Sequence, residues 1–417
     1  MGLSMAQRKA VTKELARRYG RASKPEKGRM LDELCALTGW SRRHARRALL
    51  EAVRGTQPSG ARRGRPAVYG EEVLRPLRKI WATLDGPTGK RLAPFLPEMV
   101  QAMERHGELR CSPQVRAKLL RISAATIDRL LAPDRRRVAL KGRSGTKPGS
   151  ILKAHIAIRT FAEWDDAHPG FFEADLVAHD GGNASGEFCH TLTLTDVASG
   201  WTEPRALKNK AHRWVFQALT AMERDLPMPL LGFDSDNGGE FINTTLSAWF
   251  DQRGVTFTRG RPYRKNDGCY VEQKNGAVVR QAVGYLRYDT PQELEVLTRL
   301  YAHLRLYVNY YQPQMHLLEK TRQGSRVLRR HDRARTPHQR LLDSPEVAQE
   351  AKDALRATYL SLNPVALRRE ITALQARLLE LAHLKERTRR KEVYAPQRDH
   401  PWRTPFMSQQ VPASRTS

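Results

Sequence analysis

Three carboxylates in this 417-residue chain stand where such side chains could bind metal ions. Asp175 lies inside the apolar run 171–178, which predicts a buried strand, and a buried carboxylate costs free energy unless it is paired or binds a cation. Asp236 follows another predicted strand, and Glu272 lies in the second turn of a predicted helix. Mg²⁺ prefers oxygen ligands, and two such ions about 4 Å apart can activate a nucleophile and stabilise the leaving oxygen of a phosphodiester.

The spacing and the neighbours of two of these carboxylates form a recognisable pattern. Asp236 and Glu272 have 35 residues between them, and Asn-Gly follows Asp236 directly. Glu272 lies within Val-Glu-Gln-Lys-Asn, and a Tyr-Tyr-Gln-Pro sequence ends at Pro313. These features resemble the D,D-35-E signature of insertion-sequence transposases and retroviral integrases, over about residues 165–315. The N-terminus has no His-His-Cys-Cys zinc pattern, which favours the transposase branch.

The resemblance implies an RNase H-like fold, with DNA cleavage and strand transfer as the activity. It also implies two Mg²⁺ or Mn²⁺ ions in the active site as cofactors. By the same resemblance, Asp175 would bridge both metals, Asp236 would hold one and Glu272 the other.

Other acidic residues compete for two of these assignments. Asp180 and Glu173 are rivals of Asp175, which is favoured because it is central in its predicted strand. Alternation along a strand places Glu173 on the same face as Asp175. Asp234 competes with Asp236, but it lacks both the 35-residue spacing and the following Asn-Gly.

Polar side chains near Glu272 are candidates for DNA contact. The resemblance implies such contacts on the helix of Glu272, and solvated loop charges or helix packing are the alternative. His179 and His190 could be metal ligands, although hydrogen-bonded structural histidines are the favoured interpretation. The candidates for DNA contact are Arg261, Arg264, Lys265, Lys274 and Asn275.

The sequence around the carboxylates predicts a mixed α/β domain. Strands are expected at 171–178, 188–197, 201–207, 229–234 and 255–258, and helices at 211–226, 240–253, 268–287 and 292–311. Together with the resemblance, this predicts an α/β RNase H-like catalytic core over residues 161–315, a five-stranded mixed sheet with helices. All-α helix-turn-helix modules are expected to precede it.

Residues 1–55 predict the first helix-turn-helix module. Gly39, Trp40 and Ser41 interrupt a helical pattern, and an Arg-rich helix begins after Ser41, its expected N-cap. An ordinary helical hairpin with a solvated basic face is the alternative. The arginines expected to share an exposed, DNA-binding face are Arg42, Arg43, Arg46 and Arg47.

Residues 71–132 show the same pattern, a helix that is interrupted near Ser123 and restarts after it, and predict a second helix-turn-helix module. The segment before it contains Arg63-Gly-Arg65-Pro, which resembles the core of an AT-hook, whose arginines enter the minor groove. A flexible basic linker is the favoured interpretation of that segment. Residues 133–160 have the composition of a second basic linker.

The C-terminal region, residues 316–417, is basic and predicts a helix near 364–386, followed by a disordered tail. The apolar residues of that helix recur at 4-3-4-3 spacing. This is the pattern of a short coiled coil between protomers, or of a helix that packs on its own chain. The residues are Leu367, Ile371, Leu374, Leu378 and Leu381.

Charge is unevenly distributed along the chain. The 72 Lys and Arg against 44 Asp and Glu give a net charge of +28. Residues 1–150 carry +21, residues 151–320 carry −3, and residues 321–417 carry +10. Basic flanks of this size indicate a polyanionic partner, most simply nucleic acid, and the resemblance implies that this is double-stranded DNA.

The composition argues against several other classes of protein. A hydrophobic content of 40% is enough to build cores. No apolar run approaches the ~18 residues of a membrane span, so no membrane partner is expected. The four cysteines form no CxxC pair, which argues against a disulfide scaffold or a Cys-based zinc site and fits a reducing cytoplasm. No secretory signal is visible.

We therefore expect an insertion-element transposase that binds element ends, cleaves a strand and joins the 3′-OH to target DNA. It would act in the bacterial cytoplasm at the nucleoid, as a homo-oligomer, because two ends are joined in one event. A helper protein is a further possible partner. The alternatives are an RNase H-like nuclease without strand transfer and a catalytically silent DNA-binding regulator, which the acidic triad disfavours.

Overall fold

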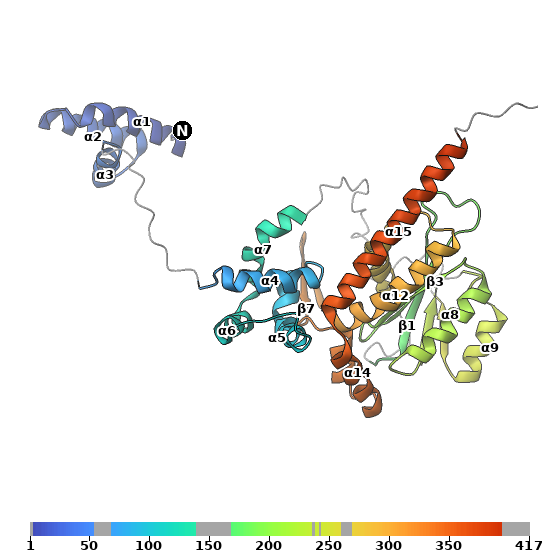
Figure 1. Ribbon diagram of the computed structural model, residues 1–417. Helices are drawn as coiled ribbons and strands as arrows, with labels where there is room; N and C mark the ends of the chain where they lie inside the picture. Colours follow the sequence, from blue (N-terminus) through green and yellow to red (C-terminus); the bar gives the residue numbers. More distant parts are fainter. Residues whose placement is uncertain are drawn as a thin grey trace, which may run out of the picture. The chain divides into compact units, whose positions relative to one another are not determined.

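The computed structural model describes residues 3–53, 68–138, 168–235, 238–241, 243–259 and 269–393. The chain divides into two compact units, residues 1–70 and residues 71–417 (Figure 1). Each unit is treated by itself below. None of the helices within these described ranges combines the length and the apolar character that crossing a bilayer requires.

The first unit is a bundle of three helices, α1 (Met5–Tyr19), α2 (Lys24–Thr38) and α3 (Arg42–Val53). Glu26 accepts a hydrogen bond from the backbone N–H of Ser23 at 2.8 Å, which caps the start of α2. Gly39 ends α2 with φ 70°, a left-handed conformation that glycine adopts without steric cost. The predicted break at Gly39–Ser41 and the helix that follows it are therefore confirmed.

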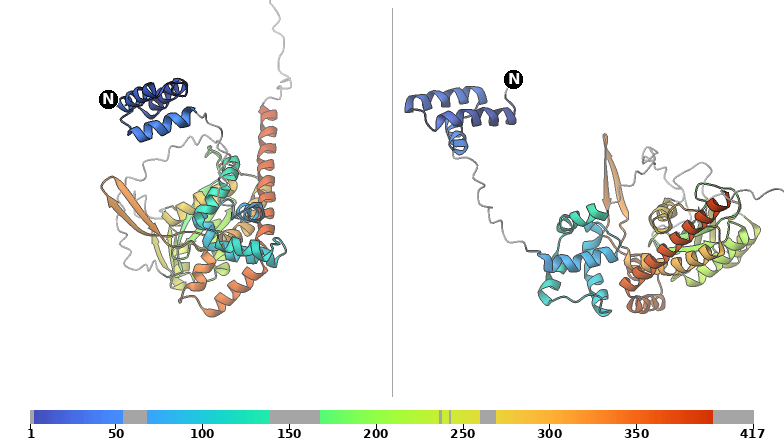
Figure 2. Two further views of the ribbon diagram at one scale, coloured as in Figure 1. Left: turned by 90° about the vertical axis from the view of Figure 1, so that its left-hand side faces the viewer. Right: turned by 45° about the horizontal axis from the view of Figure 1, so that its top comes forward.

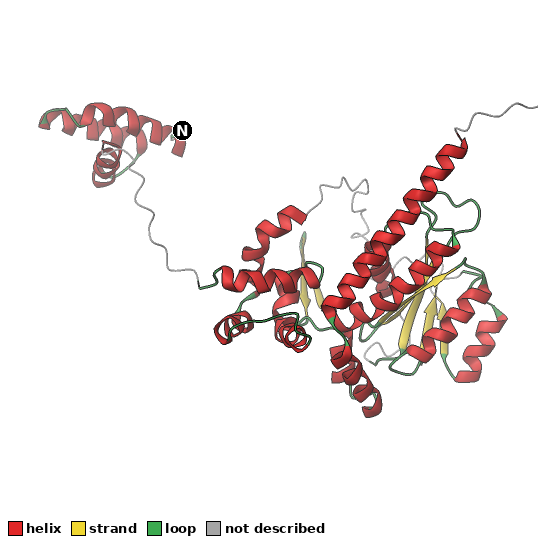
Figure 3. Ribbon diagram, in the orientation of Figure 1, coloured by secondary structure: helices red, strands yellow, loops and turns green. Residues whose placement is uncertain are grey.

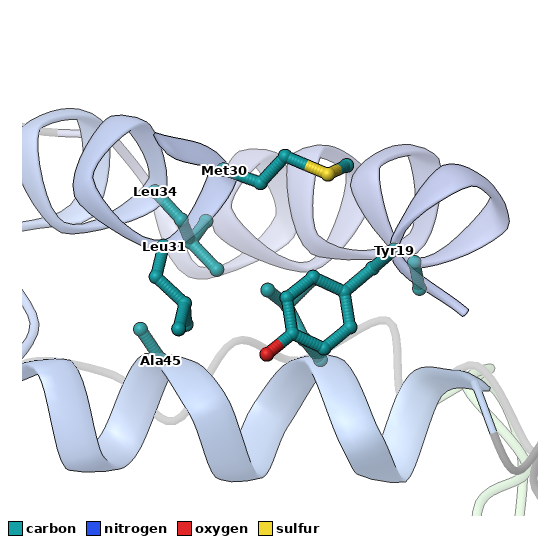
Figure 4. Packing of buried hydrophobic residues seen from close by; sticks show 7 residues of the cluster. Tyr19, Met30, Leu31, Leu34 and Ala45 are labelled. Carbon is teal, nitrogen blue, oxygen red and sulfur yellow. The ribbon is translucent and has the colours of Figure 1, made fainter. Parts of the chain in front are cut away.

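A small apolar core holds the three helices together (Figure 4). Leu34, Ala45 and Leu49 are fully buried, so one face of α3 points inward. The exposed face of α3 carries all four predicted arginines. The remaining members of this core are Ala16, Tyr19, Met30 and Leu31.

The second unit begins with four helices, α4 (Glu71–Thr83), α5 (Gly89–Arg105), α6 (Pro113–Arg121) and α7 (Ala124–Val138). Ile122 has extended backbone angles, and α7 restarts after Ser123, as the sequence predicts. The predicted start of a linker at residue 133 is wrong. Helix α7 continues through Pro133 to Val138, and its last turn carries three arginines, which favour a helix C-terminus.

The centre of this unit is a five-stranded mixed sheet in the order β3-β2-β1-β4-β5 (Figure 3). Its strands are β1 (Phe171–Ala178), β2 (His190–Asp196), β3 (Thr202–Leu207), β4 (Gly232–Ser235) and β5 (Thr256–Arg259). β1, β2 and β3 pair antiparallel, whereas β4 is parallel to both β1 and β5. The predicted fold class, an RNase H-like mixed sheet preceded by helices, is confirmed by this order.

Helices cover both faces of the sheet. α8 (His212–Asp225) and α9 (Thr244–Arg253) lie on one side, and α12 (Pro291–Tyr311) lies on the other with α15 (Pro364–Val393) packed against it (Figures 1 and 3). The predicted helix at 268–287 is divided into α10 (Cys269–Lys274), a π-helical segment η2 (Asn275–Arg280) and α11 (Gln281–Val283). π-Helical turns within α-helices are rare and often occur at functional sites.

The C-terminal region contains more structure than the sequence predicts. A hairpin of β6 (Leu317–Gln323) and β7 (Arg326–His331) is followed by α13 (Pro337–Asp343) and α14 (Gln349–Ser361). α15 extends to Val393, so the predicted tail does not begin directly after residue 386. The apolar stripe of α15, from Leu367 to Leu378, is buried within the chain. Packing on its own chain therefore accounts for the first four residues of the 4-3-4-3 pattern, and Leu381, the fifth, is half-buried.

Candidate active site

Asp175 lies on β1, the middle strand of the sheet, opposite Thr193 of β2. The side chain is half-buried. Its Oδ1 accepts the backbone N–H of Leu176 at 2.8 Å, and its Oδ2 accepts the amide Nδ2 of Asn275 at 2.7 Å. The carboxylate on the central strand is therefore held from the helical segment that follows Glu272.

The register between β1 and β4 pairs Glu173 with Asp234 and Ala174 with Ser235. Asp236 is next in the sequence but lies outside the described residues. Its rival Asp234 is buried and accepts a hydrogen bond from the hydroxyl of Thr258 on β5 at 2.8 Å. This bond gives Asp234 a contact inside the sheet.

Glu173, the rival of Asp175, serves the helix that carries Glu272. It is fully buried, and one carboxylate oxygen accepts the backbone N–H groups of Tyr270 at 2.8 Å and Val271 at 3.0 Å. These N–H groups belong to the first turn of α10, where backbone donors lack helical partners and a negative charge is stabilising. Glu173 therefore fixes α10 against β1.

Glu272 lies in this capped first turn, not in the second turn that the sequence predicts, and its side chain is exposed. Partial desolvation and, next, the negative charge of Glu173 raise the pKa of Glu272 above its usual value. A neighbouring cation would favour the charged carboxylate and so oppose this rise in pKa.

The side-chain oxygens here suit a hard divalent cation. Asn275 donates through Nδ2 to Asp175, and its buried Oδ1 has no hydrogen-bond partner among the described residues. Carboxylate and amide oxygens are preferred ligands of Mg²⁺. Across the described part of the chain, no three His, Cys, Asp or Glu side chains form a metal-binding group. Asp236, the third predicted ligand, lies outside that part.

Lys274 does not have the exposed position that its predicted phosphate contact requires. Its side chain is 8% exposed, and its ammonium donates to the side-chain oxygen of Gln314. Burial, and then the charges of Arg91 and Arg340, lower the pKa of Lys274 to about 7. The structure therefore gives Lys274 an internal role, linking α10 to the segment after α12.

The two histidines near the site have internal partners. His179 is fully buried, its Nε2 lies 2.7 Å from the hydroxyl of Thr191, and burial lowers its pKa to about 3. The Nδ1 of His190 lies 3.1 Å from the carbonyl oxygen of Phe188. Both contacts agree with the favoured interpretation of structural histidines.

Comparison with known proteins places the chain in a family. No protein-family model matches it. Over 331 residues it is 41% identical to the "Uncharacterized protein y4rM" of Sinorhizobium fredii, a match that covers 79% of this chain and 93% of that protein. The chain belongs to the y4rM family.

Solved structures that resemble the chain include two from viral systems. One is a chain in the cryo-EM structure of the simian T-cell lymphotropic virus intasome with PP2A regulatory subunit B56 gamma (15% identity, TM-score 0.29, 36% of this chain). This chain matches about half, 52%, of that chain's length. The other is the catalytic core domain of BIV integrase (16% identity, TM-score 0.27), where the match covers 34% of this chain and 85% of the domain.

The other predicted DNA-contact residues are described only in part. On α3, Arg42 is paired with Asp32, and Arg47 lies 3.5 Å from Glu51. Arg43 and Arg46 are exposed on the same helix. The predicted contacts that lie outside the described residues are Arg63, Arg65, Arg261, Arg264 and Lys265.

Sequence reasoning missed the capping role of Glu173 and the contact between Lys274 and Gln314. Strand alternation places Glu173 on the face of Asp175, and that was the one available signal. Its partners are backbone N–H groups about a hundred positions further along the chain. No side-chain pattern marks such donors.

Proposed function

We propose that this chain is a transposase of the D,D-35-E type, which cleaves a DNA strand and transfers the resulting 3′-OH to target DNA. The observation that carries the proposal is the link from Asn275 to Asp175. Through it, the segment that follows Glu272 meets the middle of β1. Asp175 and Glu272, about a hundred residues apart in the sequence, therefore lie where the central strand of the sheet meets one helical segment.

Asp175, Asp236 and Glu272 would hold the metal ions, two Mg²⁺ or Mn²⁺ per site, and Asn275, whose amide contacts Asp175, offers its Oδ1 as a further oxygen. Bound metals would stabilise the charge that develops on the attacking and leaving oxygens of the phosphodiester. Glu173 contributes by anchoring the first turn of α10, which carries Glu272. Asn275 contributes by orienting the Asp175 carboxylate.

Double-stranded DNA is the proposed partner, both as element ends and as target. The exposed arginines of α3 would read the ends, in the manner of a helix-turn-helix module. The net charge of +28 supports binding to a polyanion. A homo-oligomer on DNA is proposed because transposition joins two ends in one event.

A strand-transfer assay in Mn²⁺ tests the proposal, using labelled DNA with the ends that flank the gene. Glu272→Gln keeps the shape of the side chain and removes its charge. Glu295→Gln makes the same change at an exposed position of α12 and serves as the matched control. We expect joined products from the wild type and from Glu295→Gln, and none from Glu272→Gln.

The other outcomes would point to different functions. Nicked DNA without joined products would identify a nuclease of the same fold. DNA binding without any cleavage by the wild type would identify a regulator. Joined products from Glu272→Gln would remove Glu272 from the active site.

A further inference from the structure

The hairpin of β6 and β7 has no apolar core of its own. Every residue of both strands is exposed, and Gly324, with φ 60°, turns the chain between them. In both views of Figure 2 the hairpin stands out from the rest of the second unit. It carries five Lys or Arg side chains and one acid, Glu319. An isolated two-stranded hairpin is marginally stable in water, so a surface partner would stabilise it.

The strand register separates these charges by face. Residues paired across an antiparallel ladder point to the same side, and successive residues alternate. Lys320 pairs with Arg329, and Arg322 pairs with Val327. Lys320, Arg322 and Arg329 therefore share one face, called the cationic face below.

The opposite face of the hairpin is less basic. Glu319 pairs with Arg330, and Gln323 pairs with Arg326. The guanidinium of Arg330 lies 3.4 Å from the carboxylate of Glu319, which partly neutralises it. The hairpin thus has one face of three cations with no acid, and one face whose net charge is close to +1.

The base of the hairpin is attached firmly to the rest of the unit. The backbone N–H of His316 donates to Asp332 Oδ1 at 2.7 Å, and Arg340 pairs with the other oxygen of Asp332 at 2.7 Å. Just before His316, Gln314 pairs with Arg335 and accepts the hydrogen bond from Lys274. Lys274 is two residues from Glu272, so the segment at the base of the hairpin contacts the helix that carries a proposed catalytic residue.

A basic cavity lies at this base. Its volume is about 450 Å³, and α5, α7 and the end of the hairpin line it. Arg329 of the cationic face is part of the lining, together with Lys90, Arg333 and Arg330 of the opposite face. Asp332 is the one acid in the lining, and it is paired with Arg340. Positive charge therefore continues from the hairpin to the body of the unit.

We propose that the β6–β7 hairpin is a DNA-binding arm, whose cationic face binds the backbone of double-stranded DNA beside the active site. The major groove of B-DNA admits a two-stranded β-ribbon, and Lys and Arg side chains contact the phosphates that border it. DNA is favoured over a second copy of the chain because equal basic hairpins repel each other. The inference rests on the proposed function, because the DNA that the arm would bind is the DNA that the active site would cleave.

Two double variants of the full-length protein test this inference. Arg322→Ala with Arg329→Ala removes two charges from the cationic face. Arg326→Ala with Arg330→Ala removes two charges from the opposite face and is the matched control. Affinity for a short duplex of mixed sequence is measured across a range of salt concentrations. Circular dichroism checks that both variants fold.

We expect the cationic-face variant to bind the duplex about tenfold more weakly at low salt, with a salt slope smaller by about two, because each phosphate contact contributes about one unit. The opposite-face variant should bind nearly as the wild type does. Equal losses in both variants, or wild-type binding by both, would overturn the proposed arm. A change in oligomeric state without a change in DNA affinity would also overturn it, in favour of a protein interface.

The binding and strand-transfer assays separate this inference from the proposed function. If the wild type joins DNA ends but the cationic-face variant binds DNA normally, the hairpin is not a DNA-binding arm, and the proposed transposase function is retained. If the wild type joins no ends but the cationic-face variant loses affinity for DNA, the hairpin is a DNA-binding arm, and the proposed transposase function is rejected.

Discussion

The Asp175 carboxylate is oriented from the segment that follows Glu272, through the amide of Asn275. A hydrogen bond from a neutral donor to a carboxylate contributes about 1.5–3 kcal/mol. The same amide leaves its oxygen without a partner among the described residues. Asn275 is therefore a positioning residue with a spare oxygen, and its loss should affect the site more than the fold.

Asn275→Ala should lower the rate of strand transfer about tenfold, because about 1.4 kcal/mol of orientation is lost at Asp175. The rate is measured at saturating DNA, so that binding does not limit it. Gln273→Ala removes an amide from an exposed position of the same helix and should keep the wild-type rate. An unchanged rate in Asn275→Ala would show that Asp175 does not depend on this hydrogen bond.

At the residue scale, the sequence predicted the strand face that Glu173 and Asp175 share but not the contacts that each makes. Strand alternation correctly placed Glu173 and Asp175 on one face, but it could not tell which one caps α10. Lys274 was expected at the surface. Its burial depends on Gln314 and on packing against segments far away in the sequence, which helical spacing near Glu272 does not encode.

At the element scale, α13 joins α12 and α14 through the ring of His338. The ring centroid lies 4.9 Å from that of Tyr310 on α12 and 5.0 Å from that of Tyr359 on α14. The side chain is 4% exposed, and neither ring nitrogen has a hydrogen-bond partner among the described residues. Burial and then the charge of Arg356 lower the pKa of His338 to about 4.

His338→Phe should reduce the loss of stability at acidic pH. The unfolded chain protonates His338 near its ordinary pKa of about 6.5, and the folded chain near about 4. Between these two pH values the unfolded state binds more protons than the folded state. The contribution of the neutral imidazole to the free energy of unfolding is therefore fully present above about pH 6.5 and decreases as pH falls, by up to about 3 kcal/mol. Phe keeps the stacked ring and takes up no proton.

The free energy of unfolding in urea, measured for both proteins at about pH 7 and about pH 4.5, checks this prediction. The wild type should lose more stability than His338→Phe between the two conditions. His383→Phe changes an exposed histidine of α15 and should keep the wild-type pH dependence. Equal losses in wild type and His338→Phe would contradict a neutral buried imidazole.

Elements with a buried face were predicted from their periodicity. The five strands of the sheet and helix α12 were found because their apolar residues recur with the period of the element. The β6–β7 hairpin escaped prediction because all its residues are exposed and no apolar face exists. α13 escaped because its seven residues are too few to show a period.

At the scale of the whole molecule, the charge profile did not predict where the chain divides. The near-neutral centre of the sequence contains the sheet, but the basic segment 1–150 is split at residue 70, and only residues 1–70 form a compact unit with its own core. Charge alone could not show that α4–α7 belong to the same unit as the sheet. That follows from contacts such as the hydroxyl of Tyr307 on α12 donating to the carbonyl of Thr83 on α4 at 2.7 Å.

Two parts of the molecule would then bind DNA in different ways. The hairpin offers backbone contacts, which carry no sequence information, whereas α3 presents Arg43 and Arg46 as candidates for base contacts. Discrimination between element ends and other DNA should therefore come from the first unit. General affinity should depend on the second unit as well.

Arg43→Ala combined with Arg46→Ala should reduce the preference for element ends over a scrambled duplex by about tenfold or more, since each base contact provides about 1–3 kcal/mol of discrimination. The ratio of the two dissociation constants is the measurement. Arg17→Ala with Arg18→Ala removes the same charge from α1 and should weaken both duplexes alike, leaving the ratio unchanged. If the α3 variant also weakened both duplexes equally, α3 would bind the DNA backbone, and end recognition would lie elsewhere in the chain.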